Sequence, residues 1–400
     1  MKRLDPLYPC INLDQFSEIA EKAGSIISQV REKLLSPNAR KKPPIFTAVQ
    51  LANLCGVDKV KIAYTAKKGM LPTGTKNGQR LEWTLAETRE WVRHHRSDSI
   101  RAPDLAAGVV IAVANLKGGV GKTTTTLCLA QRLSLLGHRV LCVDLDAQGS
   151  LTHLFGILPD TEVNQENTVL DLCSGKTDSL RSAIQTTYWD GVDLICAAPC
   201  LYNLEFLMPS RQTKEKDFEF WRVLERGLDD CLSDYDVILL DTPPSMSYTT
   251  VMGLSAAQGL IVPLPPSPLD FASTQQFFSI ASEVLTGLYR SRNTEKSYSF
   301  IDVLINKPER EAISTSVRQW ITASFGGRIL PLEIPKTSAA STAGAAHGSV
   351  YDLDSSINPK TLKRVLDEYD KLGDYIENQI LCIWSADAEL TEASRTKGKV

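Results

Sequence analysis

The stretch "KGGVGKTT", residues 117–124, lies between an apolar run and a helical segment, and this order limits the possible folds more than any other feature. The run "VVIAVAN" before it is typical of a buried strand, and the helical pattern after it continues to Leu136, where Gly137 ends it. Glycines let backbone N–H groups close round phosphate oxygens, and the start of a helix adds partial positive charge. The stretch therefore predicts a phosphate-binding loop between a strand and a helix.

Further apolar runs follow, separated by helical or irregular stretches. Such alternation is typical of a mostly parallel sheet with helices on both faces, an α/β fold in which ligands bind at the carboxyl ends of the strands. We predict this fold for residues 108–400. The predicted strands lie within 109–115, 138–146, 192–198, 236–244, 259–266 and 299–306.

Two lysines lie in the predicted loop. Lys122 is expected to reach the β- and γ-phosphates of a nucleotide, and the Thr123 hydroxyl is expected to bind Mg²⁺. The usual pattern G-x-x-x-x-G-K-[ST] would place glycine at Leu116, so the loop is a variant with Lys117 directly before the glycine pair. The predicted nucleotide-binding residues here are Lys117, Gly118, Gly119, Val120, Gly121, Lys122, Thr123 and Thr124.

Acidic residues end two of the predicted strands. "VDLDAQGS" (143–150) carries Asp144 and Asp146, and "VILLDTPPS" (237–245) carries Asp241. A carboxylate at the end of such a strand holds Mg²⁺ directly or through a water, and we predict this role for Asp241 and, more weakly, for Asp144. An Asp in this position can instead cap the next turn, and this alternative stays open, above all for Asp144.

Charge is distributed unevenly along the chain. Residues 1–100 carry 17 Lys and Arg against 10 Asp and Glu, whereas residues 101–400 carry 27 against 37. Residues 40–96 alone hold 12 basic and 4 acidic side chains. A basic module joined to an acidic body indicates that nucleic acid binds at the N-terminal end.

Residues 45–97 have the pattern of a winged helix-turn-helix. Thr47 is expected to cap a helix through Leu54, Gly56 to form a tight turn, and Asp58 to cap a helix running to Lys68. Residues Asn77–Gly78 predict a two-residue hairpin turn, and "LAETREWVRHHR" predicts a closing helix. Modules of this kind often bind DNA, although some bind protein. The predicted DNA contacts are Lys59, Lys61, Tyr64, Lys67, Lys68, Lys76 and Arg80.

Residues 12–35 predict an amphipathic helix that begins at the cap Asn12 and ends before Ser36–Pro37. Its apolar face must pack on the next module or pair with the same helix of a second chain, so it is a possible dimerisation element. The predicted organisation is residues 1–44 for this helix, 45–97 for the winged module, 98–107 for a linker and 108–400 for the α/β domain.

Several classes of protein are excluded by composition. No apolar run reaches the roughly 18–20 residues of a membrane span, and the start of the chain has no apolar signal segment. The nine cysteines contain no C-x-x-C pair, which indicates reduced cytosolic thiols rather than disulfides or a zinc site.

The three motifs at 117–124, 143–150 and 237–245 together resemble those of the ParA/MinD-type ATPases, which have a deviant Walker A loop. The resemblance covers roughly residues 109–385. It implies catalytic roles for three residues: Lys117 crosses an ATP-sandwiched dimer to the partner's phosphates, Lys122 binds the phosphates in its own subunit, and Asp146 positions the attacking water. Ala147 stands where many relatives have proline. The resemblance also implies base contacts by Asn306 and Pro335, and non-specific DNA contacts among Arg318, Arg328, Lys336, Lys363 and Arg364.

With the winged module, the chain is similar to the larger partition ATPases of plasmids and secondary chromosomes. The resemblance implies ATP/ADP and Mg²⁺ as cofactors, a homodimer, binding of non-specific DNA with ATP, and slow hydrolysis stimulated by a ParB-type centromere-binding partner. It further implies operator binding and autorepression through the winged module, and a cytoplasmic, nucleoid-associated location.

Three other functions are compatible with parts of the sequence. A nucleotide-switched transcriptional regulator with little turnover remains the main alternative. Membrane positioning of the MinD kind needs an amphipathic C-terminal helix, and the tail "SADAELTEASRTKGKV" has almost no apolar face. A deviant-loop enzyme acting on a small substrate would leave the DNA-binding module unexplained.

Overall fold

The computed structural model describes residues 11–34, 41–308, 312–336, 348–352 and 358–397. The chain divides into two compact units, Met1–Lys42 and Pro43–Val400. In the described ranges, no helix combines the length and the apolar character that crossing a membrane requires.

The first unit contains a single helix, α1 (Leu13–Leu34), in its described part. Asn12 caps it as predicted: the Asn12 side chain accepts a hydrogen bond from the Gln15 amide (2.8 Å), and the Gln15 side chain accepts one from the Asn12 amide (3.0 Å). The apolar side chains of Leu13, Phe16 and Ile19 are exposed within this unit. Whether this helix packs on the next module or pairs with the same helix of a second chain stays open.

Residues 45–95 form three helices and a three-stranded antiparallel sheet of order β1-β3-β2. Thr47 and Asp58 cap α2 and α3 as predicted, and Gly56 between them has a φ of +64°. The indoles of Trp83 and Trp91 are buried, and both donate to the Pro72 carbonyl. The elements are β1 (Ile45–Thr47), α2 (Ala48–Cys55), α3 (Lys59–Lys67), β2 (Thr75–Asn77), β3 (Arg80–Thr84) and α4 (Leu85–His95).

The hairpin turn lies one residue later than predicted. Asn77 pairs with Arg80, so the two turn residues are Gly78 and Gln79 rather than Asn77 and Gly78. Gly78 has a φ of +60° at the first turn position, which is the requirement of a type II′ turn. Asn77 instead remains in the strand, and its side chain donates to Glu82 across the hairpin (2.9 Å).

The main sheet has eight strands in the order β11-β10-β9-β4-β8-β5-β7-β6, and every neighbouring pair is parallel except β6 with β7. All six predicted strands are present. The strands are β4 (Val109–Val113), β5 (Val140–Asp144), β6 (Gln185–Thr186), β7 (Val192–Ile195), β8 (Val237–Asp241), β9 (Gly259–Leu264), β10 (Phe300–Asn306) and β11 (Ile329–Ile334).

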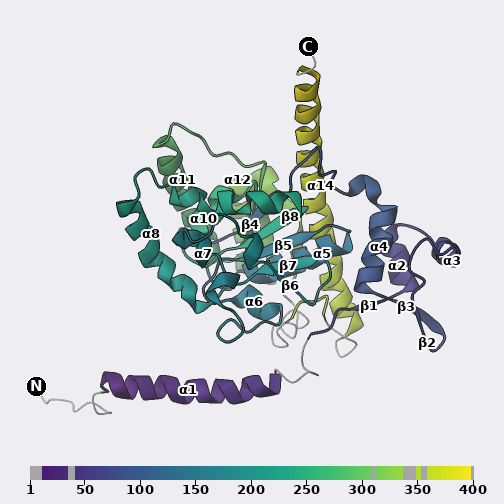
Figure 1. Ribbon diagram of the computed structural model, residues 1–400, viewed down its shortest axis with the longest axis horizontal. Coiled ribbons are helices and arrows are strands. Elements are labelled where there is room, and N and C mark those ends of the chain that lie inside the picture. Colours follow the sequence, from purple (N-terminus) through teal and green to yellow (C-terminus); the bar gives the residue numbers. More distant parts are fainter. Residues whose placement is uncertain (1–10, 35–40, 309–311, 337–347, 353–357, 398–400) are drawn as a thin grey trace, which may run out of the picture. The chain divides into compact units, whose positions relative to one another are not determined.

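Helices cover both faces of this sheet, as the alternating pattern predicted. On one face, α5 (Lys122–Leu135) and α14 (Pro359–Lys397) lie beside each other (Figure 1). The opposite face carries α7 (Leu170–Ser174), α8 (Leu204–Lys214), α9 (Val223–Leu228), α10 (Tyr248–Ala256) and α11 (Pro268–Arg290). The remaining helices of the described ranges are α6 (Ser150–Leu154), α12 (Ala312–Phe325) and the short 3₁₀ turns η1 (Ser97–Ser99), η2 (Gln165–Asn167), η3 (Arg181–Ala183), η4 (Pro199–Asn203), η5 (Phe220–Arg222), η6 (Asp229–Ser233) and η7 (Gly326–Arg328).

Two strands of the main sheet, β6 and β11, were not predicted. β6 has only two residues. β11 contains Pro331, which cannot donate to a neighbouring strand, and proline within an apolar run argues against a strand. Because β11 is at the edge of the sheet and pairs with β10 alone, the missing donor costs nothing there, and Pro331 is exposed.

Two arginines of α4, Arg89 and Arg93, and Arg96 directly after it join the N-terminal module to the residues that follow α5. Arg89 donates to the His138 carbonyl (2.8 Å), Arg96 to the Leu136 carbonyl (2.7 Å), and Arg93 to the Gly137 carbonyl. Arg89 also donates to the Ser134 carbonyl in the last turn of α5 (3.1 Å). The last carbonyls of a helix lack intrahelical donors and carry partial negative charge, so this cation stabilises the end of α5.

The segment predicted as a linker, 98–107, also packs on the α/β body. Arg101 is buried, with its guanidinium on the Asp236 carboxylate (3.0 Å) and on the carbonyl of Ala106 (3.0 Å). These contacts show that the segment packs on the α/β body, but they do not show where one domain ends and the next begins. The domain boundaries at residues 44, 97 and 107 therefore remain predictions.

Candidate nucleotide site

The conformation of the loop after β4 depends on glycines and on the buried side-chain amide of Asn115. Gly119 and Gly121 have φ values of +76° and +100°, a region that other residues rarely adopt. A Cβ on Gly121 would lie 2.1 Å from the Asn306 amide nitrogen. The Asn115 side chain donates to the Pro263 carbonyl (3.0 Å) and accepts from the Lys117 amide (3.3 Å). The loop is thereby fixed at both ends before α5 begins at Lys122.

Lys122 is buried at the start of α5, with an exposed fraction of 6%. Its ammonium donates to the Lys117 carbonyl (3.0 Å), so the loop closes round it. Burial lowers the pKa of Lys122, and the carboxylates of Asp241 and Asp146 act in the opposite direction. A buried cation at the N-terminal end of a helix is a strong binding partner for phosphate.

The acidic ends of β5 and β8 lie side by side, with Asp144 and Asp241 in register. Burial raises the pKa of Asp241 to about 8, and the charge of Asp144 acts in the same direction. One carboxylate oxygen of Asp241 accepts from the Thr126 hydroxyl (3.2 Å), and the neighbouring Thr123 side chain acts to lower the pKa of this carboxyl. The other oxygen is buried and has no hydrogen-bond partner among the described residues. An unpartnered buried carboxylate oxygen fits a bound cation.

Asp144 has a different environment. One of its oxygens accepts from the amide (2.9 Å) and hydroxyl (2.8 Å) of Thr152 in α6, and the other accepts from the Asp146 amide (3.2 Å). Burial raises its pKa to about 7. Because both oxygens already have protein donors, the geometry favours the capping role over the metal role that the sequence left open for Asp144.

A cavity of about 590 Å³ opens over the loop. Asp146 lines it together with Lys122, and the Asp146 carboxylate accepts from the Gln148 amide (3.0 Å). Within the described ranges, no cluster of three or more His, Cys, Asp or Glu side chains is placed to hold a metal ion. Mg²⁺ commonly uses one or two protein ligands with substrate phosphates and water, which matches this site. The residues lining the cavity are Gly118, Gly119, Gly121, Lys122, Thr123, Thr124, Asp146, Gln148, Ser150, His153, Leu154, Pro244 and Lys307.

Lys117 faces a different cavity of about 340 Å³, which it lines together with Asp270, Lys307 and Lys336. Its ammonium is 2.7 Å from the Asp270 carboxylate at the start of α11. The two lysines of the loop therefore line different cavities: Lys122 lines the first cavity and Lys117 lines the second.

Asn306 and Lys307 hold the loop from the end of β10. The Asn306 amide donates to the Val120 carbonyl (2.7 Å), and the Lys307 ammonium donates to the Gly119 carbonyl (2.7 Å). Pro335 is buried directly after β11 and lines neither cavity. Sequence reasoning missed Asn115, Thr126, Asp270 and Lys307. A short polar side chain at the end of an apolar strand was an available signal for Asn115, but the other three depend on non-local contacts.

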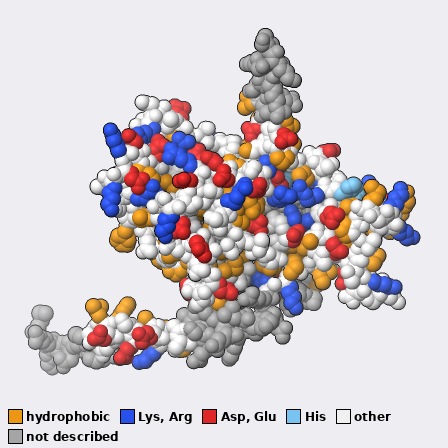
Figure 2. Space-filling view, viewed as in Figure 1, with side chains coloured by type: hydrophobic (Ala, Val, Ile, Leu, Met, Phe, Trp, Pro, Cys, Tyr) orange, Lys and Arg blue, Asp and Glu red, His pale blue; other side chains and the backbone are white. Residues whose placement is uncertain are grey.

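The predicted DNA contacts of the N-terminal module lie on its surface. Lys59, Lys61, Tyr64, Lys67 and Lys68 of α3 and the following turn are exposed, and so are Lys76 and Arg80 of the hairpin. Figure 2 shows Lys and Arg side chains at the outer end of this module.

Among the predicted C-terminal contacts, Lys363 and Arg364 on α14 are exposed. Arg318 is paired with Glu333 in a bidentate ion pair, and Arg328 of η7 lies close enough to Asp302 to lower the pKa of that carboxyl. Lys336 borders the cavity that Lys117 lines. These candidates are thus spread over several elements.

Residues 108–291 match a family described as AAA domain. The chain is 29% identical over 388 residues to a Sinorhizobium fredii protein provisionally named replication protein A, covering 92% of this chain and 95% of that protein. It is 32% identical to the chromosome-partitioning ATPase Soj of Thermus thermophilus (56% of this chain, 80% of Soj). It is 30% identical to the chromosome partitioning protein ParA of Caulobacter vibrioides (64% of this chain, 91% of ParA).

Solved structures agree in fold. A structure described as a partition protein superposes with a TM-score of 0.65 at 20% identity, covering 91% of this chain and 98% of that chain. Cobyrinic acid a,c-diamide synthase of Mycobacterium smegmatis, solved with an ATP analogue and magnesium, gives a TM-score of 0.51 at 27% identity, covering 67% and 93%. From its sequence relatives and its fold, the chain belongs to the ParA-type partition ATPases.

Proposed function

We propose that this chain hydrolyses ATP in a Mg²⁺-dependent reaction and uses the cycle to segregate DNA. The observation that carries this proposal is the cavity over the loop, which Lys122 and Asp146 line, together with the buried, unpartnered oxygen of Asp241, whose charge acts on Lys122. Lys122 and the loop amides would bind the phosphates. Thr123 and Asp241 would hold Mg²⁺, which supplies a positive charge to the phosphate oxygens. Asp146 would orient the attacking water.

ATP is proposed to join two subunits face to face. Lys117 is outside the cavity of its own chain, so a role on the phosphates of a second subunit suits its position better than a second contact in cis. A cation that arrives only in the dimer would stabilise the charge of the transition state, as an arginine finger does. Three large, exposed side chains lie near the two cavities in the chain. Tyr202 (53%) lines a third pocket that shares Asp146 with the nucleotide cavity, Phe206 (81%) follows one helical turn later, and Leu269 (75%) precedes Asp270.

DNA is the proposed partner of both ends of the chain. The exposed lysines of α3 and the hairpin would bind operator DNA through phosphate contacts and repress the chain's own operon. The basic residues of the C-terminal half would bind non-specific DNA in the ATP form. A ParB-type centromere-binding protein would stimulate hydrolysis and release, and the protein would accordingly be cytoplasmic and nucleoid-associated.

The proposal is tested by DNA binding to random DNA and to the chain's own promoter DNA, each with ADP and with a slowly hydrolysed ATP analogue. We expect random DNA to be bound with the ATP analogue and promoter DNA with ADP. If neither nucleotide altered binding to either DNA, the proposal would fail. ATPase rates with and without DNA and partner complete the test, because a zero rate with intact nucleotide binding would point to a nucleotide-switched regulator.

A further inference from the structure

Lys307 has a positive φ, which is unusual for a lysine, and its side chain contacts the phosphate-binding loop. Its φ is +52°, and the other non-glycine residues with positive φ in the described ranges are Asp217 and Asn293. Asn and Asp adopt this region more readily than a long side chain does, so the backbone at Lys307 is strained. Its amide donates to the Ile334 carbonyl (2.8 Å), which keeps the backbone in place. Strain of this kind that persists in a structure is a reason to look for a function.

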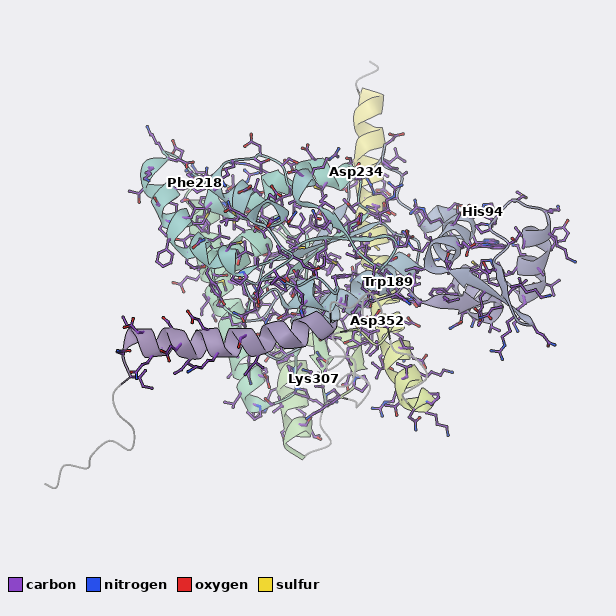
Figure 3. All side chains as sticks on the ribbon, turned by 60° about the horizontal axis from the view of Figure 1, so that its bottom comes forward. His94, Trp189, Phe218, Asp234, Lys307 and Asp352 are labelled. Atoms are coloured by element: carbon purple, nitrogen blue, oxygen red, sulfur yellow. The ribbon has the colours of Figure 1, made fainter. Side chains whose placement is uncertain are left out.

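The strained backbone directs the side chain to the loop. Lys307, labelled in Figure 3, follows the last residue of β10, and its ammonium donates to the Gly119 carbonyl (2.7 Å). The preceding residue, Asn306, donates to the next carbonyl, that of Val120 (2.7 Å). Two consecutive residues thus hold two consecutive peptide groups of the loop.

Holding these carbonyls also orients the amides. In a trans peptide the C=O of one residue and the N–H of the next point in opposite directions. Donors that hold the carbonyls of Gly119 and Val120 therefore turn the N–H groups of Val120 and Gly121 away from β10. Amides just before a helix start have no intrahelical partner and are the groups that bind phosphate in such loops.

The charge of Lys307 strengthens this effect. A cation on a carbonyl polarises its peptide, which makes the N–H of that peptide a better donor. Burial lowers the pKa of Lys307, and the neighbouring Lys336 lowers it further, while Asp270 opposes both. The hydrogen bond to the Gly119 carbonyl keeps the ammonium of Lys307 at the loop among these neighbouring charges.

We propose that Asn306 and Lys307 form a clasp that presents the Val120 and Gly121 amides to the phosphates, and that Lys307 is a positioning residue for the polyphosphate part of the nucleotide. For Asn306 this adds a contact to the loop, and the expected base contact stays a prediction. The inference rests on the proposed function, because it assumes that the cavity binds a nucleoside polyphosphate.

The test compares affinities for ADP and adenosine in the full chain, by calorimetry and by ligand-observed NMR. We expect Lys307→Met to weaken ADP binding about tenfold, a typical loss for a charge-assisted hydrogen bond, and to leave adenosine binding unchanged. Lys307→Arg should restore most of the ADP affinity. Lys336→Met removes a charge from the rim of the neighbouring cavity and should cost clearly less.

A second variant separates positioning from folding. Lys307→Gly relieves the positive φ, so its melting temperature should not fall below that of the wild type, yet its ADP affinity should fall as in Lys307→Met. ADP binding at the wild-type level in both variants would overturn the clasp, and so would an equal loss for adenosine or for Lys336→Met. Failure of the wild-type chain to bind ADP or ATP would instead refute the proposed function itself.

Discussion

The ammonium of Lys117 lies 2.7 Å from the Asp270 carboxylate of the same chain, while Lys122, five residues later, is buried in the nucleotide cavity. The side chain of Lys117 is 36% exposed and that of Asp270 is 12% exposed, so water screens this ion pair in part. In the proposed dimer, Lys117 must leave Asp270 before it can reach the phosphates of the second subunit. The pair is therefore a small barrier to dimerisation on ATP.

Asp270→Asn should lower that barrier. The asparagine keeps the size of the side chain but removes the charge, and a partly exposed pair contributes up to about 1 kcal/mol, or roughly a fivefold change. We expect dimers to form with an ATP analogue at a several-fold lower protein concentration, measured by analytical ultracentrifugation. Ser267→Ala, which removes a neighbour of Asp270 without touching Lys117, is the control. Weaker dimerisation of Asp270→Asn would mean that Asp270 assists Lys117 rather than restrains it.

Mixing two inactive variants tests whether Lys117 acts in the active site of its own subunit or in that of the second subunit. Lys117→Ala and Asp146→Ala should each bind ATP and hydrolyse it poorly, because Lys122 and the loop remain. In a mixed dimer, the site with an intact Asp146 receives Lys117 from the other subunit and should work. An equal mixture should recover about a quarter of the wild-type ATPase rate, since half of the dimers carry one working site. No recovery, in a mixture shown to form mixed dimers, would place Lys117 in its own active site.

Metal dependence distinguishes the two aligned aspartates. Asp241→Asn should abolish the difference in ADP affinity that wild type shows between Mg²⁺ and EDTA, because the unpartnered oxygen is lost as a ligand. Asp144→Asn should keep this difference and instead lower the melting temperature, because its bonds to Thr152 hold α6. The opposite pattern would exchange the two roles. Lys122→Ala, expected to abolish nucleotide binding, provides the baseline.

The sequence predicted the elements of the site better than the contacts between them. The loop, the six strands and the caps at Thr47 and Asp58 depend on local patterns of glycine, apolar and capping residues, and each is where it was expected. The contact of Lys307 with Gly119 joins residues 188 positions apart, and no local pattern indicates which side chain after β10 turns back to the loop. The pairing of Lys117 with Asp270 is equally non-local, since it depends on how α11 packs on β9, the strand next to β4.

Binding to promoter DNA should depend on α3. Replacing Lys61 and Lys67 with alanine should weaken binding in the ADP form and lower the slope of log affinity against log salt by about one for each phosphate that is no longer neutralised. Lys363→Ala on α14 is the matched control, expected to weaken random DNA binding with the ATP analogue and to leave promoter binding unchanged. Fluorescence anisotropy at several salt concentrations measures both. An unchanged salt slope in the double variant would exclude α3 from the DNA interface.

Removing the charge of Asp302 in β10 should make the folded protein more stable. The residue is 5% exposed, one carboxylate oxygen has no partner among the described residues, and burial raises the pKa of the carboxyl to about 6. A pKa raised in the folded state means that the protonated group favours folding below about pH 4, and that this contribution is lost as pH rises through 6. Asp302→Asn should therefore gain on the order of 2 kcal/mol at pH 7, and the gain should shrink towards pH 4. Thermal unfolding at several pH values measures the difference, with the exposed Asp229→Asn as control. A gain that does not change with pH would mean that packing, rather than the buried charge, is responsible.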